Sequence, residues 1–234
     1  MVKILMEIDK ELLKDIIIWD TSNWSKALSY WQSNFNIENK NYNCLELGAN
    51  QGGLSLWMAL QGNNVICSDY YSPEEKANKL HKKYKVENRI TYEAIDATNI
   101  PYENKFDVVV FKSILGGISR KENNKLKKET LDQIHKSLKD GGYLFFAENL
   151  EGSFLHNFLR KNFVSWAKEW NYLKLNEIDN VFSSYKEVSY ITLGFFGTFG
   201  LNEKQREILG NFDNVINNLI PEKQRYIIIG VAKK

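Results

Sequence analysis

The 234-residue chain is poor in cysteine, histidine and proline, and it contains no long hydrophobic run. Cys44 and Cys67 fall in short apolar segments, so we predict reduced core residues rather than a disulfide. The three histidines form no cluster with metal-ligand spacing, so no metal site is predicted. No apolar stretch approaches the roughly 20 residues that span a bilayer. Acids near the N-terminus also argue against a secretory signal, and we expect a cytoplasmic protein without a membrane span.

Net charge is also small. Thirty-one basic and 29 acidic residues leave a formal charge of +2, which gives no indication of a nucleic-acid partner. Hydrophobic residues make up 43% and charged residues 26%, as is typical of a soluble globular protein. The length suits one domain with a sizeable core, and the segment before the first predicted strand forms an elaboration.

The central motif is the segment 44–53, which reads C-L-E-L-G-A-N-Q-G-G. The apolar run 44–47 predicts a strand, and a helix is predicted to begin near Gly52. Such a turn directs backbone N–H groups and a positive helix end toward the strand's carboxyl edge, where open α/β sheets bind nucleotide-like ligands. About twenty residues later another apolar run ends at Asp69, whose carboxylate is placed to accept hydrogen bonds from both hydroxyls of a ribose.

The glycine pattern separates two cofactor classes. Dinucleotide enzymes use G-x-G-x-x-G, because the middle glycine lets the backbone approach a pyrophosphate. Here Asn50 takes the middle position, and Glu46 would repel a pyrophosphate but suits a cationic ligand. The segment resembles motif I of the Rossmann-like S-adenosylmethionine-dependent methyltransferases, (D/E)-x-G-x-G-x-G, at Glu46, Gly48 and Gly52, and departs from it at Asn50. The resemblance implies S-adenosylmethionine as cofactor.

Later segments continue an α/β pattern. After the first strand, further strands are predicted at 65–68, 89–95, 106–111, 187–193 and 225–232, and one more strand ends at residue 149. Helices are predicted at 52–61, 73–84, 121–138, 153–170 and 203–219. The sequence thus predicts a doubly wound, seven-stranded, mostly parallel sheet with helices on both faces, over residues 41–234. The resemblance implies that the last strand is antiparallel and lies between the fifth and sixth.

Residues 1–40 are predicted to form an N-terminal helical cap, with helices at 11–18 and 23–31. Three of the six tryptophans lie there, at Trp19, Trp24 and Trp31. Two interpretations stay open for this segment. It is either a helix packed on the sheet or a cover over the cofactor.

Further landmarks of the resemblance follow strands two, three and four. Asp96 and Ala97 stand where the family has an acid and a small residue beside the adenine, and Tyr70 follows Asp69. Lys112 and Ser113 occupy the motif IV position, which lines the transfer site. The resemblance therefore implies a cofactor site made of Glu46, Gly48, Asn50, Gly52, Asp69, Tyr70, Asp96, Ala97 and Lys112.

Methyl transfer to a hydroxyl benefits from a general base, so polar residues near the ends of strands four and five are catalytic candidates. They are Lys112, Glu148 and Asn149, with His156 just beyond the fifth strand. His156 has the most suitable intrinsic pKa, although a lone helical histidine is commonly structural, and Glu148 could instead orient the substrate. His81 and His135 are predicted to lie on helices away from the site.

Motifs that are absent after the fourth predicted strand narrow the class of methyl acceptor. The segment 111–114 reads F-K-S-I instead of N-P-P-Y or D-P-P-Y, which argues against methylation of nucleic-acid bases, and no double-acid loop indicates protein arginine methylation. We therefore predict O-methylation of a small molecule or sugar. Segments 23–28, 111–117 and 221–223 resemble a bacterial subgroup associated with surface-glycan gene sets.

Two other functional classes stay open. One is a nicotinamide-dependent oxidoreductase, which Glu46 and Asn50 disfavour. The other is a cofactor-binding protein that has lost catalysis and serves as an assembly partner. A homodimer is also left open.

Overall fold

A seven-stranded sheet organises the computed structural model, which describes residues 9–234 apart from the side chains of Ser165 and Trp166. The strand order is β3-β2-β1-β4-β5-β7-β6, and β7 runs in the opposite direction to the other six strands. The strands are β1 Asn43–Leu47, β2 Asn64–Asp69, β3 Ile90–Ala94, β4 Phe106–Lys112, β5 Leu138–Asn149, β6 Glu187–Leu193 and β7 Ile227–Lys233. The predicted fold class is confirmed, including the place of the last strand.

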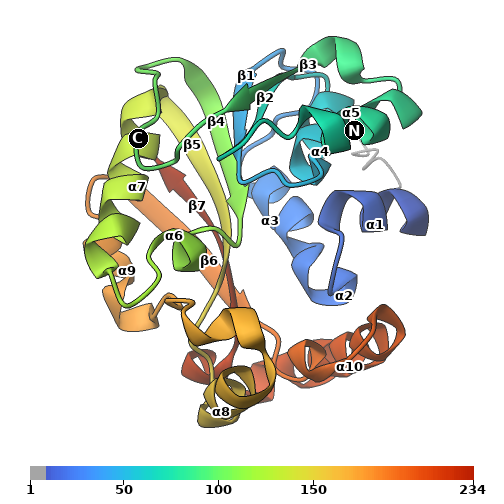
Figure 1. Ribbon diagram of the computed structural model, residues 1–234, viewed down its shortest axis with the longest axis vertical. Helices are drawn as coiled ribbons and strands as arrows, with labels where there is room; N and C mark the ends of the chain where they lie inside the picture. Colours follow the sequence, from blue (N-terminus) through green and yellow to red (C-terminus); the bar gives the residue numbers. More distant parts are fainter. Residues whose placement is uncertain (1–8) are drawn as a thin grey trace.

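Helices cover both faces of the sheet, with α1, α3, α4 and α5 on one side and α6, α7 and α9 on the other (Figure 1). The helices α8 and α10 both lie toward the same end of the sheet (Figure 1). The helix bounds are α1 Lys10–Ile17, α2 Thr21–Trp24, α3 Lys26–Asn34, α4 Gly53–Leu60, α5 Glu74–Lys83, α6 Leu115–Ile118, α7 Asn124–Ser137, α8 Phe154–Phe163, α9 Ile178–Val181 and α10 Glu203–Ile216. Within residues 9–234, every helix is too short or too polar to cross a bilayer.

Alternate residues of the central strands build the two halves of the core. In β4, Val108 and Val110 face the cluster formed with α1, α3 and α4, whereas Val109 and Phe111 face the cluster formed with α6, α7 and α9. Each of these four side chains is fully buried. A strand covered on both faces needs the near-continuous apolar run that the sequence shows here. Both cysteines lie buried in the first cluster, as predicted.

The N-terminal segment divides into two parts with different contacts. Trp31 of α3 is buried, donates its indole N–H to the carbonyl of Gly230 in β7 at 3.0 Å, and stacks on Phe145. The end of α1 instead lies on the start of α4, where a Cβ on Gly53 would stand 2.1 Å from the Ile16 carbonyl oxygen. The helix α3 is thus packed on the sheet, while the chain after α1 continues toward the carboxyl ends of β1 and β4.

One predicted helix is shorter than expected. The single helix 153–170 is wrong, because α8 ends at Phe163 and Val164 adopts an extended backbone. A separate 3₁₀ turn follows at Ser165–Lys168. The chain then returns along the end of β5, where Leu150 and Leu173 form an isolated parallel bridge.

Candidate functional site

The loop between β1 and α4 has a left-handed backbone at three positions. Gly48, Asn50 and Gly52 have φ values of 67°, 50° and 75°. Asparagine adopts this region more readily than most side chains, which explains how Asn50 can replace the middle glycine. A Cβ on Gly48 would lie 2.4 Å from Ile114 Cγ2, so this glycine is required for close packing as well as for its backbone angle.

Glu46 of β1 is almost completely buried beneath this loop. Its carboxylate accepts hydrogen bonds from the backbone N–H groups of Leu54 (3.3 Å) and Ser55 (2.8 Å) and from the Ser55 hydroxyl (2.5 Å). Burial raises the pKa of Glu46 to about 7, although these hydrogen bonds oppose the shift. A carboxylate at the first turn of a helix satisfies free N–H groups and complements the helix dipole. Glu46 therefore fixes the start of α4.

Asp69 ends β2 and faces the same loop. Its Oδ2 accepts from the backbone N–H of Asn50 at 2.9 Å, and its Oδ1 accepts from the backbone N–H of Tyr70 at 2.8 Å. Each carboxylate oxygen offers two lone pairs, so each retains one acceptor position. The side chain is half-exposed, in contrast to Glu46. This arrangement fits a ligand that offers two adjacent hydroxyl groups, as a ribose does.

Asp96 and Ala97 follow β3 at the next position along the sheet edge. Oδ1 of Asp96 accepts from both the backbone N–H and the hydroxyl of Thr98, at 2.8 and 2.7 Å. Its Oδ2 has no hydrogen-bond partner among the described residues and is free to accept from an amine. Tyr70 is 64% exposed and stacks edge-on against Tyr71, so it stands at the rim rather than inside the site.

A pocket of about 200 Å³ lies between the glycine loop and the chain that follows α1. Glu46, Gly48, Ala49, Asn50, Gly53 and Leu54 line it from the loop and α4, and Ile16, Ile18 and Trp19 line it from the N-terminal segment. Ile18 has a φ of 73°, which is unusual for a β-branched residue. The N-terminal segment thus contributes one wall of the pocket.

Lys112 and Ser113, at the end of β4, also line this pocket. The Lys112 ammonium donates to the Ile17 carbonyl at 2.7 Å and lies over the rings of Trp19 and Trp24 at 5.2 and 5.4 Å. Burial lowers the pKa of Lys112 to about 8, against the opposing attraction of Asp20, Glu46 and Glu203. A substantial fraction of the side chain is therefore neutral near pH 8 and carries a free lone pair.

Glu148 at the end of β5 is fully buried and satisfies backbone donors. It accepts from the N–H groups of Ile114 (2.9 Å) and Leu115 (2.7 Å) through Oε2, and from that of Asn149 (2.8 Å) through Oε1. Burial raises its pKa to about 7. Asn149 donates to the Ser113 hydroxyl at 2.5 Å. Together these two side chains hold the turn that connects β4 to α6.

His156 is buried in α8 and uses both ring nitrogens in hydrogen bonds with the protein. Nδ1 accepts from the backbone N–H of Ser153 at 3.0 Å, and Nε2 lies 2.9 Å from the Phe195 carbonyl oxygen. Because a carbonyl can only accept, Nε2 carries the hydrogen and the ring is neutral. Burial lowers the pKa of His156 to about 4. Neither nitrogen is available to a substrate in this arrangement.

His81 lies beside the glycine loop, which corrects the expectation that it is remote from the site. Its Nε2 is 2.9 Å from the Gly52 carbonyl oxygen, and its Nδ1 is 2.8 Å from the Tyr92 hydroxyl. A Cβ on Gly52 would lie 2.7 Å from the His81 ring. The only local signal was the pair Ala77 and His81, four residues apart on the inner face of an otherwise charged helix. His135 lies elsewhere, edge-on to Tyr185.

The structure thus gathers most of the expected cofactor residues at one sheet edge. Gly48 and Asn50 line the pocket, Asp69 is hydrogen-bonded to Asn50, and Asp69 and Asp96 keep free acceptor positions at the carboxyl ends of β2 and β3. Among the described residues, no group of three His, Cys, Asp or Glu side chains is arranged to hold a metal ion. The residues fit a nucleoside with a ribose and an exocyclic amine.

Comparisons with known proteins agree with this geometry. The family described as "Methyltransferase domain" matches residues 23–190. Phosphoethanolamine N-methyltransferase 2 from Haemonchus contortus, solved with S-adenosyl-L-methionine, aligns with a TM-score of 0.62 and 17% identity, over 90% of this chain and 52% of that chain. No curated protein sequence matches the chain.

Two further solved structures are similar in fold. Geranyl diphosphate C-methyltransferase from Streptomyces coelicolor A3(2) aligns with a TM-score of 0.63 and 10% identity, over 97% of this chain and 89% of that chain. A putative O-methyltransferase from Nostoc punctiforme PCC 73102 gives 0.61 and 16%, over 95% and 60%. The chain spans about half the length of the Haemonchus protein.

Proposed function

This chain belongs to the methyltransferase-domain family, and from that membership we propose that it methylates a hydroxyl group of a small-molecule or sugar acceptor. It is an S-adenosylmethionine-dependent enzyme by family and fold, so the predicted cofactor class is confirmed. The bound cofactor supplies an electrophilic methyl group. The neighbours in fold are named as N-, C- and O-methyltransferases, so the choice of a hydroxyl rests on the residues of this site.

In this proposal the cofactor is held between the carboxyl ends of the strands on one side and the N-terminal segment on the other. The half-exposed carboxylate of Asp69 holds the ribose hydroxyls, and Asp96 accepts from the exocyclic amine with the oxygen that Thr98 leaves free. The loop from Gly48 to Gly52 lies against the ligand with its backbone. Ile16, Ile18 and Trp19 exclude water from the side of the N-terminal segment.

The observation that carries the hydroxyl acceptor is the position and basicity of Lys112. Its amine lines the cofactor-side pocket, and burial lowers its pKa to about 8. The Ile17 carbonyl fixes the amine through one N–H. A general base works best when its pKa is close to the working pH. We therefore assign Lys112 as the group that takes the proton from the acceptor hydroxyl.

Glu148 and His156 have positioning roles in the same proposal. Glu148 holds the backbone of the turn that begins at Ser113, and His156 holds the loop at Phe195. Their hydrogen-bonding groups are engaged with the protein, so they act on the site through the segments that they fix.

A sugar acceptor is the finer form of the proposal. It is supported by the resemblance of segments 23–28, 111–117 and 221–223 to bacterial proteins of surface-glycan gene sets. The cytoplasmic location and the homodimer stay predictions from the sequence.

The proposal is tested by calorimetric titration of the purified protein with S-adenosylhomocysteine, with reduced nicotinamide cofactor as the competing ligand. We expect saturable binding of S-adenosylhomocysteine that Asp69→Ala abolishes, because the two ribose acceptors are lost. Asp179→Ala, an exposed aspartate on α9, is the matched control and should bind normally. Preference for the nicotinamide cofactor would contradict the proposal and favour an oxidoreductase.

Catalysis is tested separately by following conversion of S-adenosylmethionine to S-adenosylhomocysteine with hydroxylated sugars as acceptors. Lys112→Met should lower turnover by a larger factor than it weakens S-adenosylhomocysteine binding, because the amine also bonds the Ile17 carbonyl of the pocket wall. Equal turnover in the variant and the wild type would remove Lys112 from the reaction.

A further inference from the structure

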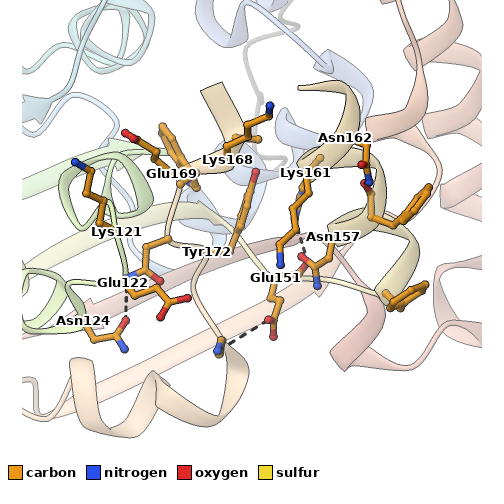
Figure 2. Close-up of a pocket in the computed structure, with 17 residues that line it drawn as sticks. Lys121, Glu122, Asn124, Glu151, Asn157, Lys161, Asn162, Lys168, Glu169 and Tyr172 are labelled. Atoms are coloured by element: carbon orange, nitrogen blue, oxygen red, sulfur yellow. Dashed lines mark hydrogen bonds and ion pairs between the residues drawn. The ribbon is translucent and has the colours of Figure 1, made fainter. Parts of the chain in front are cut away.

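We infer that a second cavity, distinct from the cofactor-side pocket, binds the phosphate group of a phosphorylated small molecule. The cavity has a volume of about 730 Å³ and lies between α8, the segment 167–174 and the turn at 121–124 (Figure 2). This volume is within the range of small-molecule sites in proteins. No residue that lines it also lines the pocket beside Lys112.

Arg160 is the first reason to expect an anion. Its side chain lines the cavity and is only 8% exposed, yet it forms no ion pair with a carboxylate among the described residues. Nη1 donates to the carbonyl oxygens of Leu150 and Glu151 at 2.9 and 3.0 Å, and the guanidinium stacks on Tyr172 at 4.1 Å. The Nε and Nη2 hydrogens have no acceptor among the side chains and backbone groups that the structure describes. Two carbonyl oxygens and one ring offset only part of the cost of burying this charge. The free edge of the arginine fork matches the oxygens of a phosphate.

Further donors lie around the same space. Figure 2 shows Lys161 and Asn157 of α8 facing Tyr172 and Glu122 across the cavity. The Tyr172 hydroxyl is buried and has no hydrogen-bond partner in the described part of the chain. Lys161 is exposed and forms no ion pair there. The Lys161 ammonium can therefore donate to a ligand without giving up an ion pair within the described part of the protein.

The charge of the lining favours a doubly charged anion. Lys121, Arg160, Lys161, Lys168 and Lys174 line the cavity, against Glu122, Glu151 and Glu169. Glu151 is 3.9 Å from Lys174, so one of the three lining carboxylates is paired with a lysine other than Lys161. The excess of two positive charges matches a phosphate monoester, which carries about −1.5 to −2 at pH 7.

An apolar wall adjoins these cations. Phe154 and Phe158, one turn apart on α8, are 85% and 49% exposed, and their rings stack with centroids 6.4 Å apart. Exposed aromatic side chains beside a cluster of donors are typical of small-molecule sites. The organic part of the phosphorylated molecule would cover these rings.

The cavity wall also touches the turn that leads away from the proposed transfer site. The backbone N–H of Asn171 donates to the Gly116 carbonyl at 3.1 Å, and Trp170 lies so close to Gly116 that a Cβ there would meet its indole at 1.9 Å. Ser113, three residues earlier, lines the cofactor-side pocket. Resting on the proposed function, we assign the cavity as the anchor for the phosphate of the methyl acceptor.

The test is calorimetric titration with inorganic phosphate at pH 8, carried out with and without saturating S-adenosylhomocysteine. The wild type should bind phosphate saturably, and Lys161→Met should weaken binding about tenfold or more, because a charge-assisted hydrogen bond is lost. Lys204→Met, an exposed lysine on α10 outside the cavity, should bind like the wild type. Arg160→Met should abolish binding, with circular dichroism as the check that it folds.

Absence of phosphate binding by the wild type, or equal binding by Lys161→Met and the wild type, would overturn the inference. These outcomes are separate from failure of the proposed function. If phosphate binds through Lys161 but S-adenosylhomocysteine does not bind, the cavity stands and the methyl-transfer proposal falls. If S-adenosylhomocysteine binds and phosphate does not, the methyl-transfer proposal stands and the phosphate site is refuted.

Discussion

Replacing Gly53 by alanine tests whether the N-terminal segment covers the cofactor. A Cβ at this position would lie 2.1 Å from the Ile16 carbonyl oxygen and 2.9 Å from that of Asp15. Both contacts are to backbone, so no side-chain rotation relieves them. The end of α1 must therefore move away from α4, and Ile16, Ile18 and Trp19 move with it as one wall of the pocket.

The size of the effect follows from overpacking. Added methyl groups in well-packed regions cost about 1–3 kcal/mol, and the gain from replacing glycine in a helix is smaller at its first residue than in its interior. If the wall contributes to binding, a displacement of this cost weakens S-adenosylhomocysteine affinity by about 5- to 150-fold. The sheet and α3 are not touched by this clash and should keep the chain folded.

Calorimetric titration with S-adenosylhomocysteine measures the effect, and circular dichroism checks the fold. Gly141→Ala is the control, because that glycine has a φ of 75° but no atom within 4 Å of the added Cβ. It should lose some stability through backbone strain and bind the ligand normally. Affinity of Gly53→Ala within twofold of the wild type, in a folded protein, would refute the covering role of the N-terminal segment.

Three further predictions concern stability and pH. Trp31→Ala should lower the free energy of unfolding by about 3–5 kcal/mol in urea titrations, whereas Trp31→Phe should lose about 1 kcal/mol with its hydrogen bond to Gly230; equal losses would contradict the packing described. The wild-type methylation rate should rise with pH and be half-maximal near pH 8, since Lys112 must be deprotonated, and a flat profile from pH 6.5 to 9.5 would contradict this. Burial raises the pKa of Asp20 to about 7, so between about pH 4 and 7 the folded state binds more protons than the unfolded state and loses stability as pH rises. Asp20→Asn should remove this part of the slope of melting temperature against pH. An unchanged slope would contradict the pKa shift.

The fold could be predicted because its signals are local. The buried run in β4 and the glycines after β1 specify a covered strand and a tight strand-to-helix turn, whatever lies around them. The order of these elements along the chain then restricts the topology to a doubly wound sheet, since parallel connections are right-handed. The last strand was placed by family resemblance, because its sequence does not reveal its direction.

The interruptions of helices were less predictable. The helices α1 and α2 are separated by Ile18 and Asp20, both with positive φ, which an aspartate tolerates but which is unusual for a β-branched residue such as Ile18. The buried contact between Asp20 and the Tyr226 hydroxyl joins residues 206 positions apart. Such long-range partners decide the local backbone and leave no signal in the nearby sequence.

Histidine roles were equally hidden from the sequence. An intrinsic pKa near neutrality makes His156 a suitable base, yet burial and two protein hydrogen bonds lower its pKa to about 4. His81 lies beside the glycine loop only because α5 packs against α4. The intrinsic pKa of a side chain suggests candidate bases, and its burial and hydrogen bonds decide which candidates can act.

The four acidic residues near the strand ends also differ in their surroundings rather than in their chemistry. Glu46 and Glu148 are buried, and each accepts at least two backbone N–H bonds at the start of a helix. Asp69 and Asp96 also accept backbone bonds, but they stay exposed enough to keep acceptor positions for a ligand. A motif cannot distinguish these two groups, because all four residues are carboxylates after or within a strand. The donors that each carboxylate already satisfies do distinguish them: Glu46 and Glu148 hold helix starts, whereas Asp69 and Asp96 keep the free acceptor positions that the proposed ligand recognition requires.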